Sequence, residues 1–325
     1  MRRAPSRITS SDVAREAGVS QTTVSFVLNG TRGQTIPEET RRRVLEAAKR
    51  LDYRPRASAR SLAAGRSDVV LLALPGVPIS ANLSRFIEQF AAALAEYGLS
   101  LVTHLAEGRP LPDLCAAVDA SAVVSLIPFD DETAQALRRA GAEVVLGAGE
   151  QGSAGLQEIG RLQARHIISL GRDRLGYALP GGHASQWRVQ ERLRGVAAEC
   201  ADSGLAEPVA REVEMDAEAA ALAVDDWVAE SVTGVCAYND ETAIAVLAGL
   251  HLRGLRAPQD IAVIGVGDVA TARVSIPALS TIGFDYAEQG RELAQAVAAR
   301  LDLVSEPVPA VEGIARPRLI LRASA

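Results

Sequence analysis

The stretch DVAREAGVSQTTVSFVLN, residues 12–29, decides the architecture of the N-terminal part of the chain. Its first half carries the apolar face of a short helix, formed by Val13, Ala14 and Ala17. Gly18 is placed to end that helix, because glycine adopts the left-handed C-cap conformation easily. Ser20 can then cap a second helix over residues 21–29. Two short helices joined by a glycine-containing turn predict a helix-turn-helix, whose second helix enters the major groove of DNA.

The flanking residues extend this pattern. Thr9 and Asp12 have the spacing of a capping box at the start of the first helix. In the second helix one side is apolar, with Val24, Val27 and Leu28 at helical spacing. The opposite side carries Thr22, Ser25, Phe26 and Asn29, with Gln21 at its exposed N-terminal edge. A third helix is expected after Pro37, with a buried stripe of Val44, Leu45, Ala48 and Leu51 and an exposed set of Arg41, Arg42, Arg43 and Arg50.

Charge is distributed unevenly along the chain. Residues 1–66 carry a net charge of +8, and the remaining residues carry −14. A small basic module on an acidic body is expected where only one end of a protein meets a polyanion. A solvated basic tail would show the same charge, but it would not show the helical periodicity and caps of this segment.

Other classes of protein find little support in the sequence. No run approaches the roughly 20 apolar residues of a membrane helix, and the basic N-terminus leads into no apolar signal-peptide core. Three widely spaced cysteines and four scattered histidines predict no disulfide framework and no metal site. Neither a catalytic nucleophile with its base nor a phosphate-binding loop is recognisable, so we expect no enzyme activity, no catalytic residue and no cofactor.

From Ser67 onward short β-rich runs alternate with helical stretches, as in βαβ units with parallel sheets. The expected strands are 69–74, 99–104, 122–127, 143–146, 175–179, 234–237 and 261–266. The expected helices include 84–97, 132–140, 188–203, 218–230 and 240–253. In open sheets of this kind, ligands bind beyond the carboxyl ends of the strands, here between two lobes.

The headpiece resembles that of the lactose-repressor (LacI/GalR) family. The resemblance rests on the string at 12–29, on TRRRV at 40–44, on LDYRP at 51–55 and on ARSLA at 59–63, which is similar to the family's hinge. By that resemblance Gln21 and Thr22 read bases, while other polar residues of the headpiece set the register on phosphates. Leu62 is expected to wedge into the minor groove. The full set of expected DNA contacts is Thr9, Ser20, Gln21, Thr22, Thr23, Ser25, Phe26, Asn29, Arg56, Arg60 and Leu62.

Two of these positions have a competing structural role. Phe26 stands where some family members carry arginine, and phenylalanine can pack on a thymine methyl group but cannot bind guanine in a bidentate way. It could instead fold back onto the small core of the headpiece. Leu62 could cap the next domain instead of wedging into DNA, although Arg60 and two neighbouring alanines favour the wedge.

The rest of the chain is similar to the family's periplasmic-binding-protein-like core, most clearly after residue 160. The resemblance therefore implies an all-α helix-turn-helix headpiece followed by a two-lobed α/β core with two parallel sheets and flanking helices. The expected divisions are a headpiece at 1–54, a hinge at 55–66 and a core at 67–325. Within the core we expect an N-lobe at about 67–155 and 285–311, and a C-lobe at about 156–284 and 312–325.

The effector pocket implied by the resemblance departs from the family pattern. Arg192 and Asn239 match effector-binding positions, and their chemistry suits a polyol or a carboxylate. Many sugar-binding relatives have an aspartate where this chain has Gly267, and the next acid is Asp268. The full set of expected effector contacts is Trp187, Arg192, Asn239, Asp268 and Phe284. Arg192 and Asn239 could instead be interlobe structure alone, and Trp187 is expected to pack and not to stack on a ligand.

The resemblance implies a cytoplasmic, nucleoid-associated transcriptional regulator. We expect a repressor that binds a palindromic operator as a homodimer and is gated by a small polar effector, a sugar or another metabolite. The alternative is a ligand-independent repressor whose pocket has degenerated. A secreted solute-binding protein would share the core, but it would carry a signal peptide in place of the basic headpiece. No leucine-heptad tail follows Arg322, which favours a dimer over a tetramer.

Overall fold

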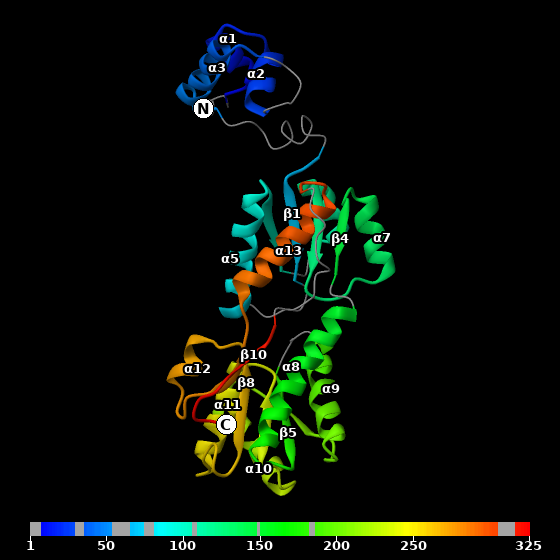
Figure 1. The fold of residues 1–325 in the computed structure, drawn as a ribbon, viewed down its shortest axis with the longest axis vertical. Coiled ribbons are helices and arrows are strands. Elements are labelled where there is room, and N and C mark those ends of the chain that lie inside the picture. Colours follow the sequence, from blue (N-terminus) through cyan, green and yellow to red (C-terminus); the bar gives the residue numbers. More distant parts are fainter. Residues whose placement is uncertain are drawn as a thin grey trace, which may run out of the picture.

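A computed structural model describes residues 8–29, 36–53, 66–74, 81–105, 109–147, 150–181, 186–304 and 316–325. Figure 1 shows three groups of elements along the long axis of the molecule: a cluster of helices from the N-terminal residues, then a first α/β lobe, then a second. The expected helix-turn-helix headpiece and two-lobed α/β core are confirmed.

The headpiece consists of α1 (Ser10–Ala17), α2 (Gln21–Asn29) and α3 (Glu38–Arg50). The expected capping box is present: Asp12 N donates to Thr9 Oγ1 at 3.4 Å, and Thr9 N donates to Asp12 Oδ2 at 2.9 Å. Gly18 ends α1 with a φ of 66°, in the left-handed region. These local signals turn the chain sharply, so that α1 and α2 can share one small apolar core with α3.

One residue of the expected core is placed wrongly by the sequence pattern. Leu45 was expected in the buried stripe of α3, but 48% of it is exposed. Ala47 is fully buried instead, next to Ala48 and Val44. The helical period explains the difference: Ala47 lies three residues from Val44 on the same face, whereas Leu45 is rotated by about 100°.

The N-lobe is built on a four-stranded parallel sheet in the order β2-β1-β3-β4. Its strands are β1 (Val69–Ala73), β2 (Ser100–His104), β3 (Ala120–Ser125) and β4 (Val144–Leu146). One face packs against α5 (Ala81–Glu96) and α13 (Tyr286–Arg300). The other face packs against α6 (Leu111–Val118) and α7 (Asp131–Arg139). Both faces are therefore covered, as expected for a parallel sheet.

The C-lobe is built on a six-stranded sheet in the order β10-β9-β8-β7-β5-β6. All its pairings are parallel except the one between β10 and β9. The strands are β5 (Leu175–Pro180), β6 (Val209–Val213), β7 (Gly234–Ala237), β8 (Ala262–Val266), β9 (Ser280–Gly283) and β10 (Arg318–Ile320). The helices are α8 (Glu150–Ser169), α9 (Gln186–Asp202), α10 (Ala217–Ala229), α11 (Asp240–Leu252) and α12 (Ala270–Val274).

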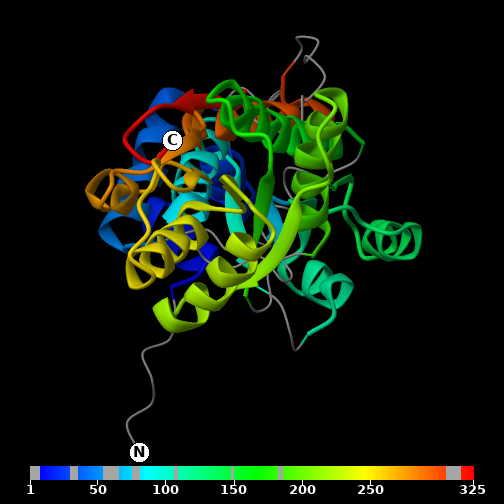
Figure 2. The ribbon, with the colours of Figure 1, turned by 90° about the horizontal axis from the view of Figure 1, so that it is seen from below.

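Alternate strand residues of the C-lobe face two different helical layers. Leu175 and Tyr177 of β5 pack with α8 and α9, whereas Ala178 of the same strand packs with α10 and α11. Figure 2 shows α8 and α9 on one side of the strands and α10 and α11, in yellow-green to yellow, on the other. At the carboxyl end of this sheet, β5 is followed by α9 on one side and β7 is followed by α11 on the other.

Two contacts connect distant parts of the sequence in the N-lobe. Helix α13 follows the C-lobe strands in the chain but packs along α5 of the N-lobe. Arg66 donates from Nη1 to the carbonyl oxygen of Leu301 at 2.5 Å, just after α13 ends. The start of the core is therefore fixed to a helix that itself begins where the chain leaves the C-lobe.

Candidate DNA-binding and effector sites

The N-terminus of α2 is prepared for an anion. Ser20 caps it: the Thr23 backbone N–H donates to Ser20 Oγ at 3.1 Å, and the two hydroxyl oxygens lie 2.8 Å apart. The first turn of α2 contains no acidic side chain. Since a helix N-terminus carries a partial positive charge and unpaired N–H groups, this end suits a DNA phosphate.

The outward face of α2 carries the expected base-reading residues. Gln21 and Thr22 are exposed, and Gln21 Nε2 donates to Ser10 Oγ at 2.8 Å, which connects α2 to α1. Thr23, Ser25 and Phe26 are half-buried. Phe26 does not belong to the apolar cluster of the headpiece, which favours its outward orientation over packing into that core.

Several expected DNA contacts lie outside the described residues. These are the hinge positions Arg56, Arg60 and Leu62, and the side chain of Asn29. Their roles stay predictions. Thr9 is described, and its hydroxyl donates to Asp12 Oδ2 at 2.7 Å within the capping box of α1.

Arg192 lies on α9 with only 7% of its surface exposed. It donates from Nη1 to the carbonyl oxygen of Tyr238, and its guanidinium carbon lies 4.6 Å from the centre of the Tyr238 ring. Its Nε has no hydrogen-bond partner among the described residues. The guanidinium is thus oriented by the carbonyl oxygen and the ring of Tyr238, and its buried Nε donor remains unused.

Asn239 serves as the N-cap of α11. Its Oδ1 accepts a hydrogen bond from the Thr242 backbone N–H at 2.8 Å. The carbonyl half of the side-chain amide is therefore committed to the helix, and the NH₂ half is the part that could meet a ligand. In a hydrogen bond to an effector, Asn239 would therefore be the donor.

Asp268 is committed to ion pairs inside the C-lobe. Its carboxylate binds the guanidinium of Arg322 and, at 3.0 Å, that of Arg273. The pKa of Asp268 is lowered: burial raises it, but hydrogen bonds from the two arginines outweigh that effect. Both oxygens already have cationic partners, so this acid is poorly placed to accept hydrogen bonds from a sugar.

The two remaining expected effector residues pack on the C-lobe core. Trp187 and Phe284 are half-buried and contact the apolar cluster that includes Tyr177 and Ile264. The Phe284 ring also lies 6.0 Å from the ring of Tyr286 at the start of α13. These contacts are those of packing residues at the lobe junction.

Arg188 is a residue that the sequence analysis missed. It lies one helical turn before Arg192 on α9, and its Nη1 donates across the lobes to the carbonyl oxygen of Leu126 at 3.2 Å. Burial lowers the pKa of Arg188, and the charge of Arg192 lowers it further. The i, i+4 spacing of two arginines on a helix that follows a C-lobe strand was the available signal.

Glycine at position 267 brings the two lobes into contact. Gly267 follows β8 with a φ of +134°, and a Cβ there would lie 2.0 Å from Nδ2 of Asn82 on α5. The space beside Gly267 is therefore occupied by an amide from the N-lobe. Asn82 Oδ1 is buried and has no partner among the described residues.

Residues 9–56 match the bacterial regulatory proteins of the lacI family, and residues 164–325 match a periplasmic binding protein-like domain. The chain is 28% identical over 296 residues to the HTH-type transcriptional repressor PurR of Photobacterium profundum, covering 83% of this chain and 85% of that protein. It is 28% identical over 332 residues to the HTH-type transcriptional regulator GalR of Escherichia coli, covering 96% and 94%. The chain belongs to the LacI family.

The fold of this LacI-family protein agrees with a solved relative over its full length. A lac repressor dimer bound to operator and the anti-inducer ONPF superposes with a TM-score of 0.76 at 21% identity, covering 98% of this chain and 99% of that one. The protein is a DNA-binding transcriptional regulator, and the curated relatives named above are regulators, not enzymes. No described helix is long and apolar enough to cross a membrane.

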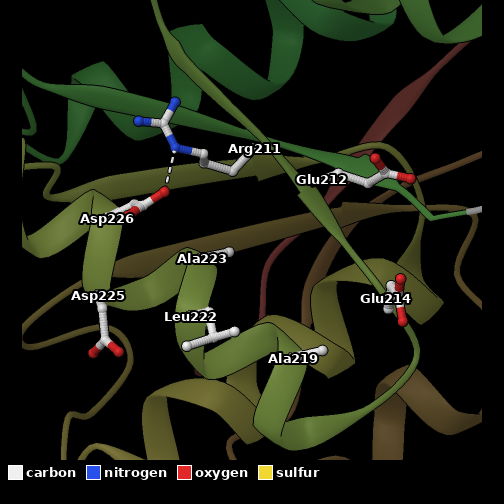
Figure 3. Close-up of a pocket in the computed structure, with 8 residues that line it drawn as sticks. All are labelled: Arg211, Glu212, Glu214, Ala219, Leu222, Ala223, Asp225 and Asp226. Atoms are coloured by element: carbon white, nitrogen blue, oxygen red, sulfur yellow. Dashed lines mark hydrogen bonds and ion pairs between the residues drawn. The ribbon is translucent and has the colours of Figure 1, made fainter.

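A hollow of this LacI-family core lies between the edge strand β6 and α10 (Figure 3). It encloses about 370 Å³ and is lined by Arg211, Glu212, Glu214, Ala219, Leu222, Ala223, Asp225 and Asp226. The one cation of this lining is paired, since Arg211 Nε lies 2.8 Å from Asp226. None of the expected effector residues lines this hollow. In the described part of the chain no group of acidic, histidine or cysteine side chains could hold a metal ion.

Asp240, the first residue of α11, is completely buried beside the lobe junction. It accepts hydrogen bonds from Thr281 Oγ1 at 2.5 Å and from the Val269 N–H at 2.9 Å. Burial raises its pKa to about 6. The contribution of Asp240 to the free energy of unfolding is therefore fully present below its pKa in the unfolded chain, and it is lost as the pH rises through about 6.

We predict that Asp240→Asn stabilises the core at neutral and higher pH. The amide keeps the carboxyl's shape, accepts from Val269 N–H and donates to the Thr281 hydroxyl, but it carries no charge. The gain should approach about 3 kcal/mol above pH 7 and shrink toward pH 4. Urea unfolding across this pH range measures it, with the exposed Asp173→Asn as control. Equal gains at both ends of the range would contradict the assignment of the charge to Asp240.

Proposed function

We propose that this protein is a sequence-specific transcriptional repressor that binds a palindromic operator as a homodimer. The observation that carries the proposal is the headpiece: a capped helix-turn-helix with polar residues on the outward face of α2, within a segment of net charge +8. The core, by contrast, is acidic. In the relative with the same fold, a dimer is bound to operator. A protein with this partner acts in the cytoplasm, at the nucleoid.

Homodimer formation has support in the core. Val274 at the end of α12 is 77% exposed and Ile276 is 94% exposed, although both are large apolar residues. Adjacent exposed apolar side chains on an otherwise acidic body are expected where a second subunit packs. We propose a C2 pairing through this surface, which would hold two headpieces at the spacing of two half-sites.

We further propose that a small molecule between the lobes gates DNA binding. Arg192 shares α9 with Arg188, which bonds to Leu126 of the N-lobe. The helix cap uses only the carbonyl half of the Asn239 amide, and the relative with the same fold holds the anti-inducer ONPF. The proposal includes the divisions at 1–54, 55–66 and 67–325, with the hinge connecting lobe closure to the headpieces. An effector shifts DNA affinity only by its affinity difference between the open and closed states, typically about 1–3 kcal/mol.

A ligand-independent repressor is the second candidate, and specific observations favour it. The side-chain carbonyl of Asn239 caps α11, and the carboxylate of Asp268 forms ion pairs with two arginines. Thermal denaturation in the presence of candidate metabolites separates the two candidates, because a molecule that binds the native state raises the melting temperature.

Base selection by α2 gives the direct test. Gln21→Ala or Thr22→Ala should change the bases preferred in a selection from a random-sequence duplex library, since each lost base contact costs about 1–3 kcal/mol. Ser11→Ala, an exposed change on α1, is the matched control and should leave the preference intact. If both α2 variants select the same sequence as the wild-type protein, α2 is not the reading helix.

A further inference from the structure

The lobe junction contains two guanidinium groups without an acidic partner. Arg188 and Arg192 lie one turn apart on α9. Among the described residues, no carboxylate oxygen lies within 4.0 Å of either group. Their described hydrogen-bond partners are the backbone carbonyl oxygens of Leu126 and Tyr238 and the side chain of Tyr238, none of which is a carboxylate. Burying two like charges together is unfavourable unless an anion compensates them.

The acids nearest to this pair bind other groups. Asp240 accepts from Thr281 and Val269, and Asp268 is paired with Arg322 and Arg273. Glu191, between the two arginines in sequence, points to α8 and to Arg194: it accepts from Gln157 Nε2 at 2.7 Å and pairs with the Arg194 guanidinium. The local carboxylates are therefore directed away from Arg188 and Arg192 and leave their charge uncompensated.

Two tyrosine hydroxyls near the arginine pair can each donate a hydrogen bond to a ligand. The Tyr177 hydroxyl is fully buried and has no hydrogen-bond partner among the described residues, and the charge of Arg192 is close enough to affect its pKa. Burial raises the pKa of Tyr286 on α13, and the nearby charges of Arg192, Arg188 and Arg85 of the N-lobe lower it. Together with the guanidinium N–H groups, these hydroxyls offer several donors to a ligand that is rich in acceptors.

We propose that the effector is an anion, a small molecule bearing a carboxylate or a phosphate group, and that Arg188 and Arg192 together bind that group. A planar guanidinium can bind either group with two parallel hydrogen bonds, and the free Nε of Arg192 supplies a buried donor for one of them. The unpartnered Asn82 Oδ1 from the N-lobe requires a donor, which a hydroxyl or amine on the same ligand would provide. This inference rests on the proposed effector site and names its ligand class.

The competing role for Arg188 is a latch between the lobes, through its hydrogen bond to Leu126. The two roles differ in the ligand-free protein. A charge kept unpaired for a ligand lowers stability, so Arg188→Gln should hold or raise the melting temperature without ligand. A latch stabilises the protein, so its removal would lower that temperature.

The test uses thermal denaturation of the full chain with inorganic phosphate, and separately with malonate, at constant ionic strength. We expect either anion to raise the melting temperature of the wild-type protein by roughly 5 °C near saturation. Arg188→Gln and Arg192→Gln should each lose most of this rise. Arg139→Gln on α7, which removes an exposed arginine far from the junction, should keep it. Glucose, a neutral polyol, should give no rise in any of the four proteins.

Two outcomes overturn the proposal. One is a rise that is equal in all four proteins, since that is a general salt effect on the surface. The other is no rise in the wild-type protein with either anion, together with a lower melting temperature of ligand-free Arg188→Gln, which assigns Arg188 to the latch. Binding of the same proteins to the selected duplex keeps the proposed function separate. If duplex binding is salt-sensitive and anions have no effect, only the anion inference falls; if no duplex is bound, the proposed function falls.

Discussion

The affinity of the protein for its selected duplex should fall about 10³-fold or more between roughly 50 and 200 mM salt. Each headpiece that neutralises several phosphates releases the counterions condensed on them, and two headpieces give a log–log slope on the order of −5 to −10. The positive charge is concentrated in the DNA-binding end of the chain: residues 1–66 carry a net charge of +8, and the remainder carries −14. The acidic core should repel DNA, so the headpieces alone must supply the attraction.

Fluorescence anisotropy at several salt concentrations measures this slope. A scrambled duplex of equal length should show weaker binding and a similar slope, because phosphate contacts carry no sequence information. Arg43→Gln removes an exposed cation, for which no ion pair is found among the described residues, from each of the two headpieces and should make the slope shallower by about 2. Affinity that is constant across the salt range would exclude the headpiece as the DNA-binding element.

The headpiece could be predicted closely because its determinants are local. Thr9 with Asp12, Gly18 and Ser20 each act within four residues, so their spacing alone sets where α1 and α2 begin and end. Leu45 shows the limit of this approach. Choosing between Leu45 and Ala47 for the inner face of α3 requires the exact rotation of the helix against its neighbours, and side-chain hydrophobicity favoured the wrong one.

The core was predictable where strands are apolar throughout. β7 (Gly234–Ala237) has the expected bounds, and most of the other expected strands agree within one or two residues. β6, β9 and β10 were not expected. β6 is an edge strand with exposed or half-exposed Arg211 and Glu212, and β10 has only three residues. β9 begins with Ser280 and Thr281, which are buried only because their hydroxyls bond to Ala325 and Asp240 from distant parts of the chain.

The effector site shows the same division between local and distant causes. That Arg192 and Asn239 lie at the lobe junction follows from their places near the N-termini of α9 and α11. Other features of the site depend on residues that the fold brings together. Asn239 caps its own helix, and Arg322 and Arg273 pair with Asp268. Asn82 fills the space beside Gly267. The sequence therefore predicts where the site is better than it predicts which groups remain free in it.

The crossing of α8 and α9 sets the position of both junction arginines. A Cβ on Gly195 would lie 1.9 Å from the carbonyl oxygen of Gln157, and a Cβ on Gly160 would lie 2.1 Å from the carbonyl oxygen of Arg192. Each glycine thus touches the backbone of the opposite helix. Backbone atoms cannot turn aside as a flexible side chain can, so a methyl group at either position must push the helices apart.

We predict that Gly195→Ala destabilises the C-lobe by about 3 kcal/mol and weakens effector binding, since Arg192 belongs to the contact that is displaced. Because one separation of the helices relieves both clashes, Gly160→Ala combined with Gly195→Ala should cost clearly less than the sum of the two single changes. Urea unfolding followed by circular dichroism measures all three variants. Gln190→Ala, an exposed change on α9, is the control. Duplex binding by the headpieces at low temperature should persist in each variant, because the described headpiece helices α1, α2 and α3 pack on one another in a small core of their own. Strict additivity of the two single changes would mean that the helices yield independently, and the position of Arg192 would then not depend on this crossing.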